Sequence, residues 1–207
     1  PKTDIAALAR LYGFPQWLAV RLIKDLGATD AVALMKASNE QAPLFIAVNK
    51  AKASDQEIVA LFADCGITAQ PQTIDGVEIP GCYFISNSKI LLDGRISHAL
   101  AQGKILVSDV AAQRVAMLAL PEEKPAAFLE IGAGRGTKTI LLQSNAQRKY
   151  GSQMKHYTLD NHEFKARVLR ERAEKYGIEV ADALTLDATE MTAEDFPETF
   201  DAVFIDA

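Results

Sequence analysis

The first 40 residues carry apolar positions three and four apart, a spacing that predicts short amphipathic helices. We expect one helix to run from a Thr3 cap to Leu11 and a second to begin at Pro15, because proline is favoured at the first position of a helix. A third helix is expected from Thr29 to Met35. The start of the chain is therefore predicted to be entirely helical.

From Pro43 onward the pattern changes to a mixture of strands and helices. A continuous apolar run over 44–48 predicts a buried strand, and Ser54 is placed to cap the helix after it. A region marked by Pro and Gly leads to Gly81. The other elements expected in this part are strands over 66–69 and 105–107 and helices over 96–101 and 111–120. This composition is typical of a small α+β module.

Beyond a polar, proline-bounded joint at 121–125 the alternation becomes regular. Strands are predicted over 126–131, 156–160, 179–184 and 201–205, and helices over 137–148 and 162–176. Strands that alternate with helices of this length imply a parallel, doubly wound sheet, so the fold class is α/β. We therefore divide the chain into a helical and α+β domain (1–120) and a Rossmann-like domain (121–207).

Composition narrows the function classes. Hydrophobic residues make up 49% and charged residues 24% of the 207, which is typical of a globular protein, and no apolar run approaches the roughly 20 residues that span a bilayer. With no leader and only two cysteines, we expect a cytoplasmic protein without disulfides and without a membrane partner. The net charge of −5 argues mildly against nucleic acid, although a local basic patch can exist within it. The three histidines have no metal-ligand spacing, so no metal is expected.

A glycine-rich turn follows the strand that ends at Ile131. Its residues are Gly132, Ala133, Gly134, Arg135 and Gly136, and a helix begins directly after them. Such a turn lets the backbone approach a ligand closely. The dinucleotide fingerprint and the phosphate-binding loop both fail at Thr137, where each requires Gly. The phosphate-binding loop stays a rival, because the apolar strand that ends at Asp206 resembles the acidic strand of such NTPases.

Three carboxylates near the ends of successive strands favour a different ligand. Glu130 lies beside the turn, where an acid suits the ammonium of a methionine better than a triphosphate. Asp160 ends the next strand and is placed to accept both ribose hydroxyls, and Asp187 follows the third strand and is placed for the adenine amino group. Lys138, one turn into the helix, can meet a carboxylate. This set predicts S-adenosylmethionine as the cofactor.

The sequence resembles the RsmB/Sun family of RNA cytosine-5 methyltransferases over nearly its whole length. The family loop reads Asp-x-Cys-Ala-Ala-Pro-Gly-Gly-Lys-Thr, and this chain matches it in register at Glu130, Ala133, Gly136, Lys138 and Thr139. The segment 107–113 is similar to the family's Gln-Asp-x-Ala-Ser-Gln approach, 11–18 to its His-Pro-x-Trp-Leu helix, and 43–50 to its RNA-recognition-like module. Arg135 and Thr137 depart from the family pattern.

The resemblance implies methylation of cytosine carbon 5 in RNA, with ribosomal RNA as the expected partner. It also implies that Asp206, which begins the family's Asp-Ala-Pro-Cys motif, is a catalytic residue that hydrogen-bonds the base. The family's two cysteines lie after that motif, and neither Cys65 nor Cys82 matches them by position. We therefore expect an incomplete methyltransferase core that binds the cofactor but does not methylate alone. A methyltransferase of another substrate class and a non-catalytic RNA-binding relative remain alternatives.

Overall fold

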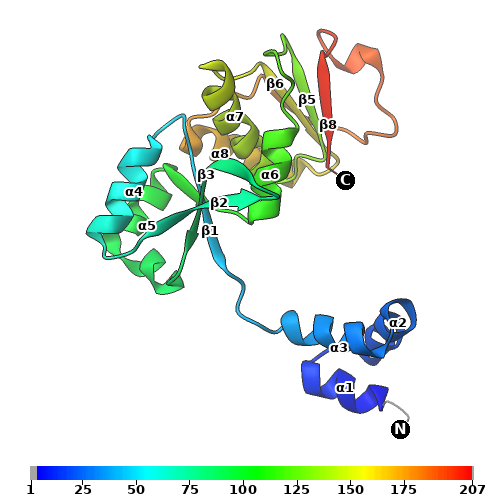
Figure 1. The fold of residues 1–207 in the computed structure, drawn as a ribbon. Helices are drawn as coiled ribbons and strands as arrows, with labels where there is room; N and C mark the ends of the chain where they lie inside the picture. Colours follow the sequence, from blue (N-terminus) through cyan, green and yellow to red (C-terminus); the bar gives the residue numbers. More distant parts are fainter. Residues whose placement is uncertain (1–3, 207) are drawn as a thin grey trace. The chain divides into compact units, whose positions relative to one another are not determined.

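The computed structural model describes residues 4–206 and divides into two compact units, residues 1–42 and 43–207 (Figure 1). The first unit contains α1 (Ile5–Tyr12), α2 (Gln16–Leu26) and α3 (Ala28–Ala37), so the predicted helical start is confirmed. Two predicted helix starts need comment. Thr3 lies outside the described residues, and the cap of α1 is Asp4, whose carboxylate accepts from the amide of Ala7 at 3.0 Å. Thr29 lies inside α3, because that helix begins directly after Gly27.

The first sheet of the larger unit is antiparallel, with strand order β2-β3-β1-β4. Its elements are β1 (Leu44–Val48), α4 (Asp55–Asp64), β2 (Ala69–Ile74), β3 (Val77–Ile85), the 3₁₀ helix η1 (Ser88–Leu92), α5 (Gly94–Ala101) and β4 (Ile105–Val107). This β-α-β-β-α-β succession is the ferredoxin-like arrangement. Ser54 caps α4 as predicted, its hydroxyl accepting from the amide of Glu57 at 3.1 Å.

The hairpin of β2 and β3 corrects the sequence prediction, which placed one short strand at 66–69 and a loop up to Gly81. Asp75 and Gly76 form the turn with positive φ angles of 52° and 77°. Two consecutive positive φ angles fit the tight turn that matches the twist of paired strands. Pro71 lies in the edge strand β2, and the pairing register shifts between Pro71 and Thr73. A proline is tolerated at such an edge, which is why it does not end the strand.

The second sheet is parallel, with strand order β7-β6-β5-β8, and confirms the predicted Rossmann-like fold. Its elements are α6 (Val110–Leu118), β5 (Phe128–Ile131), α7 (Thr137–Tyr150), β6 (His156–Asp160), α8 (Glu163–Tyr176), β7 (Asp182–Thr185), the 3₁₀ helix η2 (Ala193–Asp195) and β8 (Ala202–Ile205). In sequence order the strands lie 3-2-1-4, so the direction of strand addition reverses between β5 and β8. Ligands of such sheets bind outside the carboxyl ends of the strands at this reversal.

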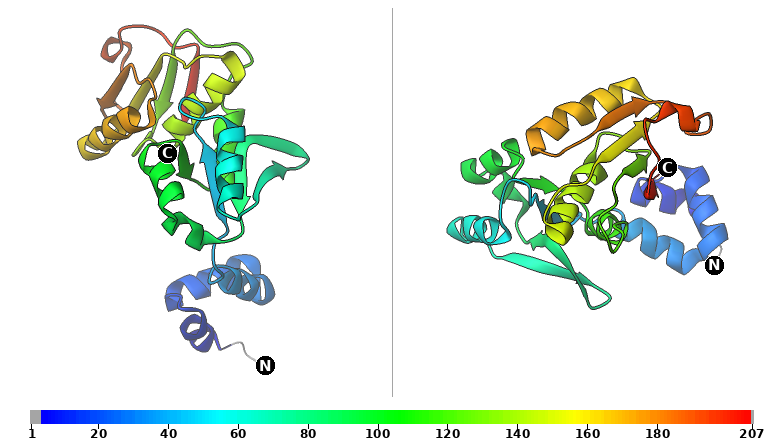
Figure 2. Two further views of the ribbon diagram at one scale, coloured as in Figure 1. Left: turned by 90° about the vertical axis from the view of Figure 1, so that its left-hand side faces the viewer. Right: turned by 90° about the horizontal axis from the view of Figure 1, so that it is seen from above.

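The two sheets share a hydrophobic core. In β1, Ile46 and Val48 pack in the cluster that includes residues of α4 and α5, whereas Ala47 points to the opposite face. Ala47 packs in a cluster that includes Phe128 of β5 and Ile140 of α7. Helix α7 accordingly lies between the two sheets in all three views (Figures 1 and 2). Residues 43–207 form one compact unit, in which the α+β module is packed against the Rossmann-like sheet.

Candidate functional site

A cavity of about 330 Å³ opens at the carboxyl ends of the parallel strands, where the fold predicts a ligand. It is lined by Ile131, Gly132, Gly134, Leu159, Asp160, Asn161, Lys165, Leu186, Asp187, Ala188 and Asp206. Five of these residues were predicted from the sequence: two loop glycines and three carboxylates. The structure therefore brings these two glycines and three carboxylates together at a single cavity.

The glycine turn is held open by backbone contacts to the neighbouring strand. The amides of Gly132 and Ala133 both donate to the carbonyl of Leu159, at 2.8 and 3.1 Å. Gly134 has a φ of +57°, and the nearest atom to a β-carbon built there is the carbonyl oxygen of Gly132 at 3.9 Å. Gly134 also lines the cavity. The turn is thus shaped for close approach of a ligand to the main chain.

Asp160 is the most constrained acid of the cavity, with only 7% of its surface exposed. Its Oδ2 accepts from the amide of Gly134 at 3.0 Å, and its Oδ1 accepts from the amide of His162 at 3.0 Å. Lys165 approaches the same carboxylate at 3.2 Å. Burial alone would raise the pKa of Asp160, but the hydrogen bonds from Lys165 and the two amides outweigh burial and lower that pKa. Asp160 is therefore a fixed, ionised acceptor at the end of β6.

The other two acids of the cavity are less buried. Asp187 accepts from the amide and the hydroxyl of Thr189, at 2.9 and 2.7 Å, and these bonds lower its pKa. Asp206 follows β8, and its carboxylate forms an ion pair with the ammonium of Lys138 in the first turn of α7. This pair joins the end of β8 to the first turn of α7. Lys138 itself does not line the cavity, and its contact with the cofactor stays a prediction.

Glu130, predicted beside the ligand, is not among the residues that line the cavity, and its carboxyl group is directed to α7. Its side chain is 0% exposed; Oε2 accepts from the hydroxyl of Thr139 at 2.7 Å and lies 3.1 Å from Nε2 of His156. The strand pleat explains this direction, because Glu130 shares a face with Phe128, which packs against α7. Within the described residues its Oε1 has no hydrogen-bond partner.

Three predicted loop residues also lie outside the cavity lining. Ala133 is buried in a cluster with Leu169 of α8, and a β-carbon on Gly136 would come within 2.9 Å of Leu169 Cγ. Arg135 is exposed, with its guanidinium 5.5 Å from the ring centre of Phe164. These residues shape the turn against α8 and do not line the cavity.

Sequence reasoning missed Lys165, which it placed on a solvated helix face, and Asn161. Both lie within five residues of the end of β6. The cavity thus has three carboxylates and one ammonium among its lining groups, a balance that disfavours a triphosphate and suits a ligand rich in hydroxyl and amino groups. Over residues 4–206, no group of three or more His, Cys, Asp or Glu side chains is placed to hold a metal ion. In the same range, no helix is long and apolar enough to cross a membrane.

Comparison with known proteins agrees with this architecture. A family model described as the RsmF/B-like methyltransferase, ferredoxin-like domain, matches residues 14–81. The ribosomal RNA small subunit methyltransferase B of Xanthomonas campestris pv. campestris is 35% identical over 144 residues, which are 68% of this chain. The match covers 30% of that relative's length, so the chain corresponds to less than a third of it.

Solved structures show the same fold. The crystal structure of PH0851 has a TM-score of 0.75 at 21% identity and covers 100% of this chain and 44% of that one. A methyltransferase homolog from Pyrococcus horikoshii has a TM-score of 0.67 at 16% identity and covers 91% and 58%. NSun6 from the same organism, crystallised with SFG, has a TM-score of 0.62 at 15% identity and covers 100% and 70%.

The parallel sheet of order 3-2-1-4, with a glycine turn after its first strand and an acid at the end of its second, is the Rossmann-like fold that this chain shares with these solved structures. The ferredoxin-like sheet that precedes it in the sequence agrees with the family model for the ferredoxin-like domain of RsmF/B-like methyltransferases. This chain belongs to the RsmB/Sun family of methyltransferases.

Proposed function

We propose that this chain supplies the cofactor-binding part of an enzyme that transfers a methyl group from S-adenosylmethionine to carbon 5 of cytosine in ribosomal RNA. The observation that carries the cofactor assignment is the fixed carboxylate of Asp160, bonded to the amide of Gly134 at the mouth of the glycine turn. The RNA assignment is supported by family membership and by the name of the Xanthomonas relative. Because the chain spans only 30% of that relative, we propose RNA methylation as an activity of the longer protein that contains this chain.

Each part of the cofactor has a candidate partner in the cavity. Asp160 would accept hydrogen bonds from the ribose hydroxyls, and Asp187 from the adenine amino group. The open backbone at Gly132 and Gly134 would receive the amino-acid end. When bound, S-adenosylmethionine supplies an electrophilic methyl group. Asp206 would hydrogen-bond the target base, and its ion pair with Lys138 would hold it at the edge of the cavity.

The chemistry at carbon 5 requires a group that this chain does not offer. That carbon is a poor nucleophile, so a thiolate must first add to carbon 6 of the ring. Burial raises the pKa of Cys82 to about 12, and burial also raises the pKa of Cys65. Neither thiol is therefore poised as a nucleophile, and neither lines the cavity. We expect residues 1–207 alone to bind the cofactor without methylating RNA.

Calorimetry on the 207-residue chain tests the cofactor assignment. We expect S-adenosylmethionine to bind and ATP not to bind. Asp160→Ala should weaken cofactor binding by about 1–3 kcal/mol, because the ribose loses its charged acceptor. Glu171→Ala, which removes an exposed acid from α8, is the control for net charge and should leave the affinity unchanged. Binding of ATP without S-adenosylmethionine would refute the assignment and favour an NTPase.

The RNA assignment is tested in a full-length protein that carries this chain. Ribosomal RNA is incubated with the protein and S-adenosylmethionine, and the nucleosides are analysed by mass spectrometry. We expect 5-methylcytosine at a defined position. A methyl group on another atom, with normal cofactor binding, would keep the methyltransferase assignment and refute the cytosine-5 chemistry.

A further inference from the structure

A polar junction joins the two sheets where β1 ends, at the opposite end of α8 from the cofactor cavity. Asn49 directly follows β1 and is 0% exposed. Its Nδ2 donates to the carbonyl of Gly103 at 2.8 Å and to the carbonyl of Tyr176 at 2.7 Å. Gly103 precedes β4 of the ferredoxin-like sheet, and Tyr176 is the last residue of α8. One amide group thus ties the end of β1 to both domains.

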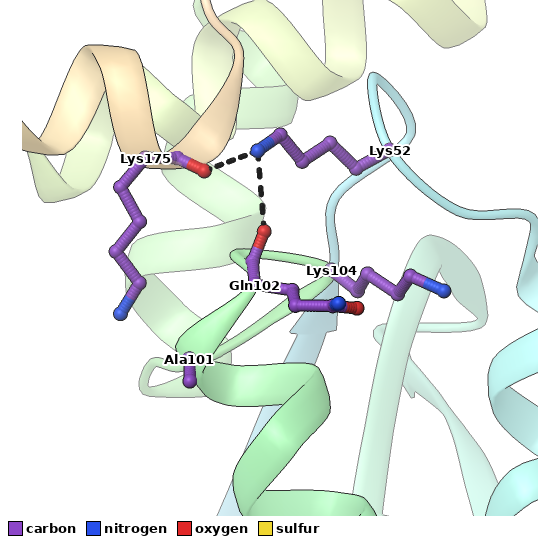
Figure 3. Close-up of a pocket in the computed structure, with 5 residues that line it drawn as sticks. All are labelled: Lys52, Ala101, Gln102, Lys104 and Lys175. Atoms are coloured by element: carbon purple, nitrogen blue, oxygen red, sulfur yellow. Dashed lines mark hydrogen bonds between the residues drawn. The ribbon is translucent and has the colours of Figure 1, made fainter.

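Lys52 makes a second link of the same kind (Figure 3). Its ammonium donates to the carbonyl of Gln102 at 3.2 Å and to the carbonyl of Lys175. These carbonyls lie at the carboxyl-terminal ends of α5 and α8, where the two helix dipoles both present negative charge. Because two such ends would repel each other, the ammonium between them stabilises their approach.

Glycines allow the two helix ends to come this close. A β-carbon on Gly103, whose φ is +71°, would lie 2.6 Å from the carbonyl oxygen of Lys175. A β-carbon on Gly177, whose φ is +61°, would lie 2.8 Å from Cε of Lys52. Both glycines favour positive φ and leave room for the partner, so the backbone on each side of the junction is fitted to one arrangement.

Helix α7 is bonded to the same connection from its own side. Arg148 forms an ion pair with Asp55 at the start of α4 and donates to the carbonyl of Val48 at 3.0 Å. The hydroxyl of Ser144 also donates to the carbonyl of Val48, at 3.1 Å, and accepts from the amide of Lys50 at 2.9 Å. The segment after β1 is therefore held by directional bonds to two helices of the Rossmann-like domain.

We propose that Asn49 and Lys52 are positioning residues: they lock the ferredoxin-like module in one orientation on the methyltransferase core, so that RNA held by the module meets the cofactor in a fixed geometry. This inference rests on the proposed function. The apolar cluster that includes Ala47 favours association of the module with the core, but the hydrophobic effect is non-directional and does not by itself fix their relative orientation. The bonds to the carbonyls of Gln102, Gly103, Lys175 and Tyr176 have defined directions and remove that freedom.

The lock itself is tested on the 207-residue chain by a distance measurement between spin labels. Labels are placed at Thr73→Cys in β2 and Glu171→Cys in α8, both exposed positions, in a Cys65→Ser background in which Cys82 stays buried. We expect a narrow distance distribution that broadens in Lys52→Met and in Asn49→Ala. Lys52→Arg keeps a cation with several donors and should restore the narrow distribution.

Lys104→Met is the matched control. Lys104 lines the same cavity as Lys52, but its ammonium bonds Glu57 at 2.8 Å within the ferredoxin-like module. Loss of its charge should leave the distribution narrow. An unchanged distribution in both Lys52→Met and Asn49→Ala would overturn the lock, and so would an equal broadening in Lys104→Met.

The positioning role is tested by kinetics in a full-length protein with the same substitutions. We expect kcat for RNA methylation to fall about tenfold or more in Lys52→Met, because small misplacements of reacting groups carry penalties of this size. The KM for RNA and the Kd for S-adenosylmethionine should change less than about twofold, and Lys52→Arg should recover kcat. An unchanged kcat despite a broadened distribution would overturn the positioning role. A parent protein that methylates no RNA would instead refute the proposed function, while the distance measurement would still decide the lock.

Discussion

The two sheets of residues 43–207 bury different kinds of side chain. The cluster between the ferredoxin-like sheet and its helices α4 and α5 consists of apolar residues alone, with Phe62 and several isoleucines fully buried. The Rossmann-like sheet instead buries ionisable groups within its strands: Glu130 and His156 are 0% exposed and Asp160 is 7% exposed. Both sheets use the same backbone chemistry, so the contrast lies in the side chains placed along the strands.

Burying a charged group is costly unless it is paired or hydrogen-bonded, so such groups persist where they serve a purpose. Asp160 ends its strand at the cavity, whereas Glu130 lies one strand away and bonds Thr139 in the first turn of α7. One acid therefore lines the cavity and the other faces the helix that follows the glycine turn. The ferredoxin-like sheet has no comparable pair among its described residues, and its fully buried polar residue, Asn49, serves the junction.

The largest expected change in stability comes from the apolar cluster of the ferredoxin-like sheet. Phe62→Ala removes a fully buried ring from the cluster beneath α4, and we expect the free energy of unfolding to fall by about 3–5 kcal/mol. Urea denaturation followed by circular dichroism measures the change. Under conditions where the variant is folded, its affinity for S-adenosylmethionine should match the wild type. Phe164→Ala, at a ring that is 53% exposed, is the control and should cost much less. A weakened cofactor affinity in folded Phe62→Ala would show that the apolar cluster of the ferredoxin-like sheet also contributes to cofactor binding.

The sequence predicts the parallel sheet better than the antiparallel one, for a physical reason. Strands that alternate regularly with long helices stand out in the sequence, so β5, β6 and β8 are predicted within two residues of their observed bounds. The hairpin of β2 and β3 has many exposed residues and contains Pro71 and Pro80, so its sequence lacks a clear strand pattern. Its turn at Asp75 and Gly76 is a strong hairpin signal that the pattern analysis did not use.

In the site, positions at strand ends could be predicted but side-chain directions could not. Asp160, Asp187 and Asp206 reach the cavity because parallel strands bring their carboxyl ends to one edge. The direction of Glu130 depends on the pleat of β5, and its pairing with Thr139 depends on the path of α7. Lys165 was missed because alternating charges on a helix are typical of a solvated face, and only the tertiary fold brings its ammonium to Asp160.

Glu130→Gln should have the next largest effect and sharpens the distinction between the two acids. The shape is retained, but one of the two carboxyl oxygens beside Thr139 and His156 is replaced by an amide nitrogen, so we expect a loss of about 1–3 kcal/mol in the free energy of unfolding. Because the side chain does not line the cavity, cofactor affinity should stay within about twofold. Thermal unfolding and calorimetry on the same sample measure both quantities. A large loss of affinity with unchanged stability would restore the predicted contact between Glu130 and the ligand.

Substitutions of two glycines in the turn should have smaller effects, one mainly on stability and the other mainly on cofactor affinity. Gly134→Ala and Gly136→Ala both place a side chain at positive φ, which costs about 1 kcal/mol. The β-carbon at 136 also approaches Leu169 within 2.9 Å, so this variant should be the less stable of the two. Gly134 lines the cavity and Gly136 does not, so the variant at 134 should bind S-adenosylmethionine more weakly. Denaturant unfolding and calorimetry give the two rankings, and the reverse order in either would show that the ligand approaches the turn elsewhere.

The smallest expected effect concerns a carboxylate of the ferredoxin-like module, which contrasts with Asp160. Hydrogen bonds from the side chain and the amide of Arg95 lower the pKa of Asp93 from 3.8 to about 2, against little burial. A lowered pKa means that Asp93 stabilises the fold above the unfolded value and loses this contribution as the pH falls from about 4 towards 2. Because the Arg95 and Asp93 side chains are 53% and 28% exposed, the contribution is screened by solvent and salt. Carbon-detected NMR titration should give a midpoint near 2 for Asp93 that rises towards 3.8 in Arg95→Ala. An Asp93 midpoint near 3.8 in the wild type would mean that this surface pair is not formed in solution. The lowered pKa of Asp160 instead rests on hydrogen bonds from Lys165 and from the amides of His162 and Gly134 to a carboxylate that is only 7% exposed, so salt should weaken it less.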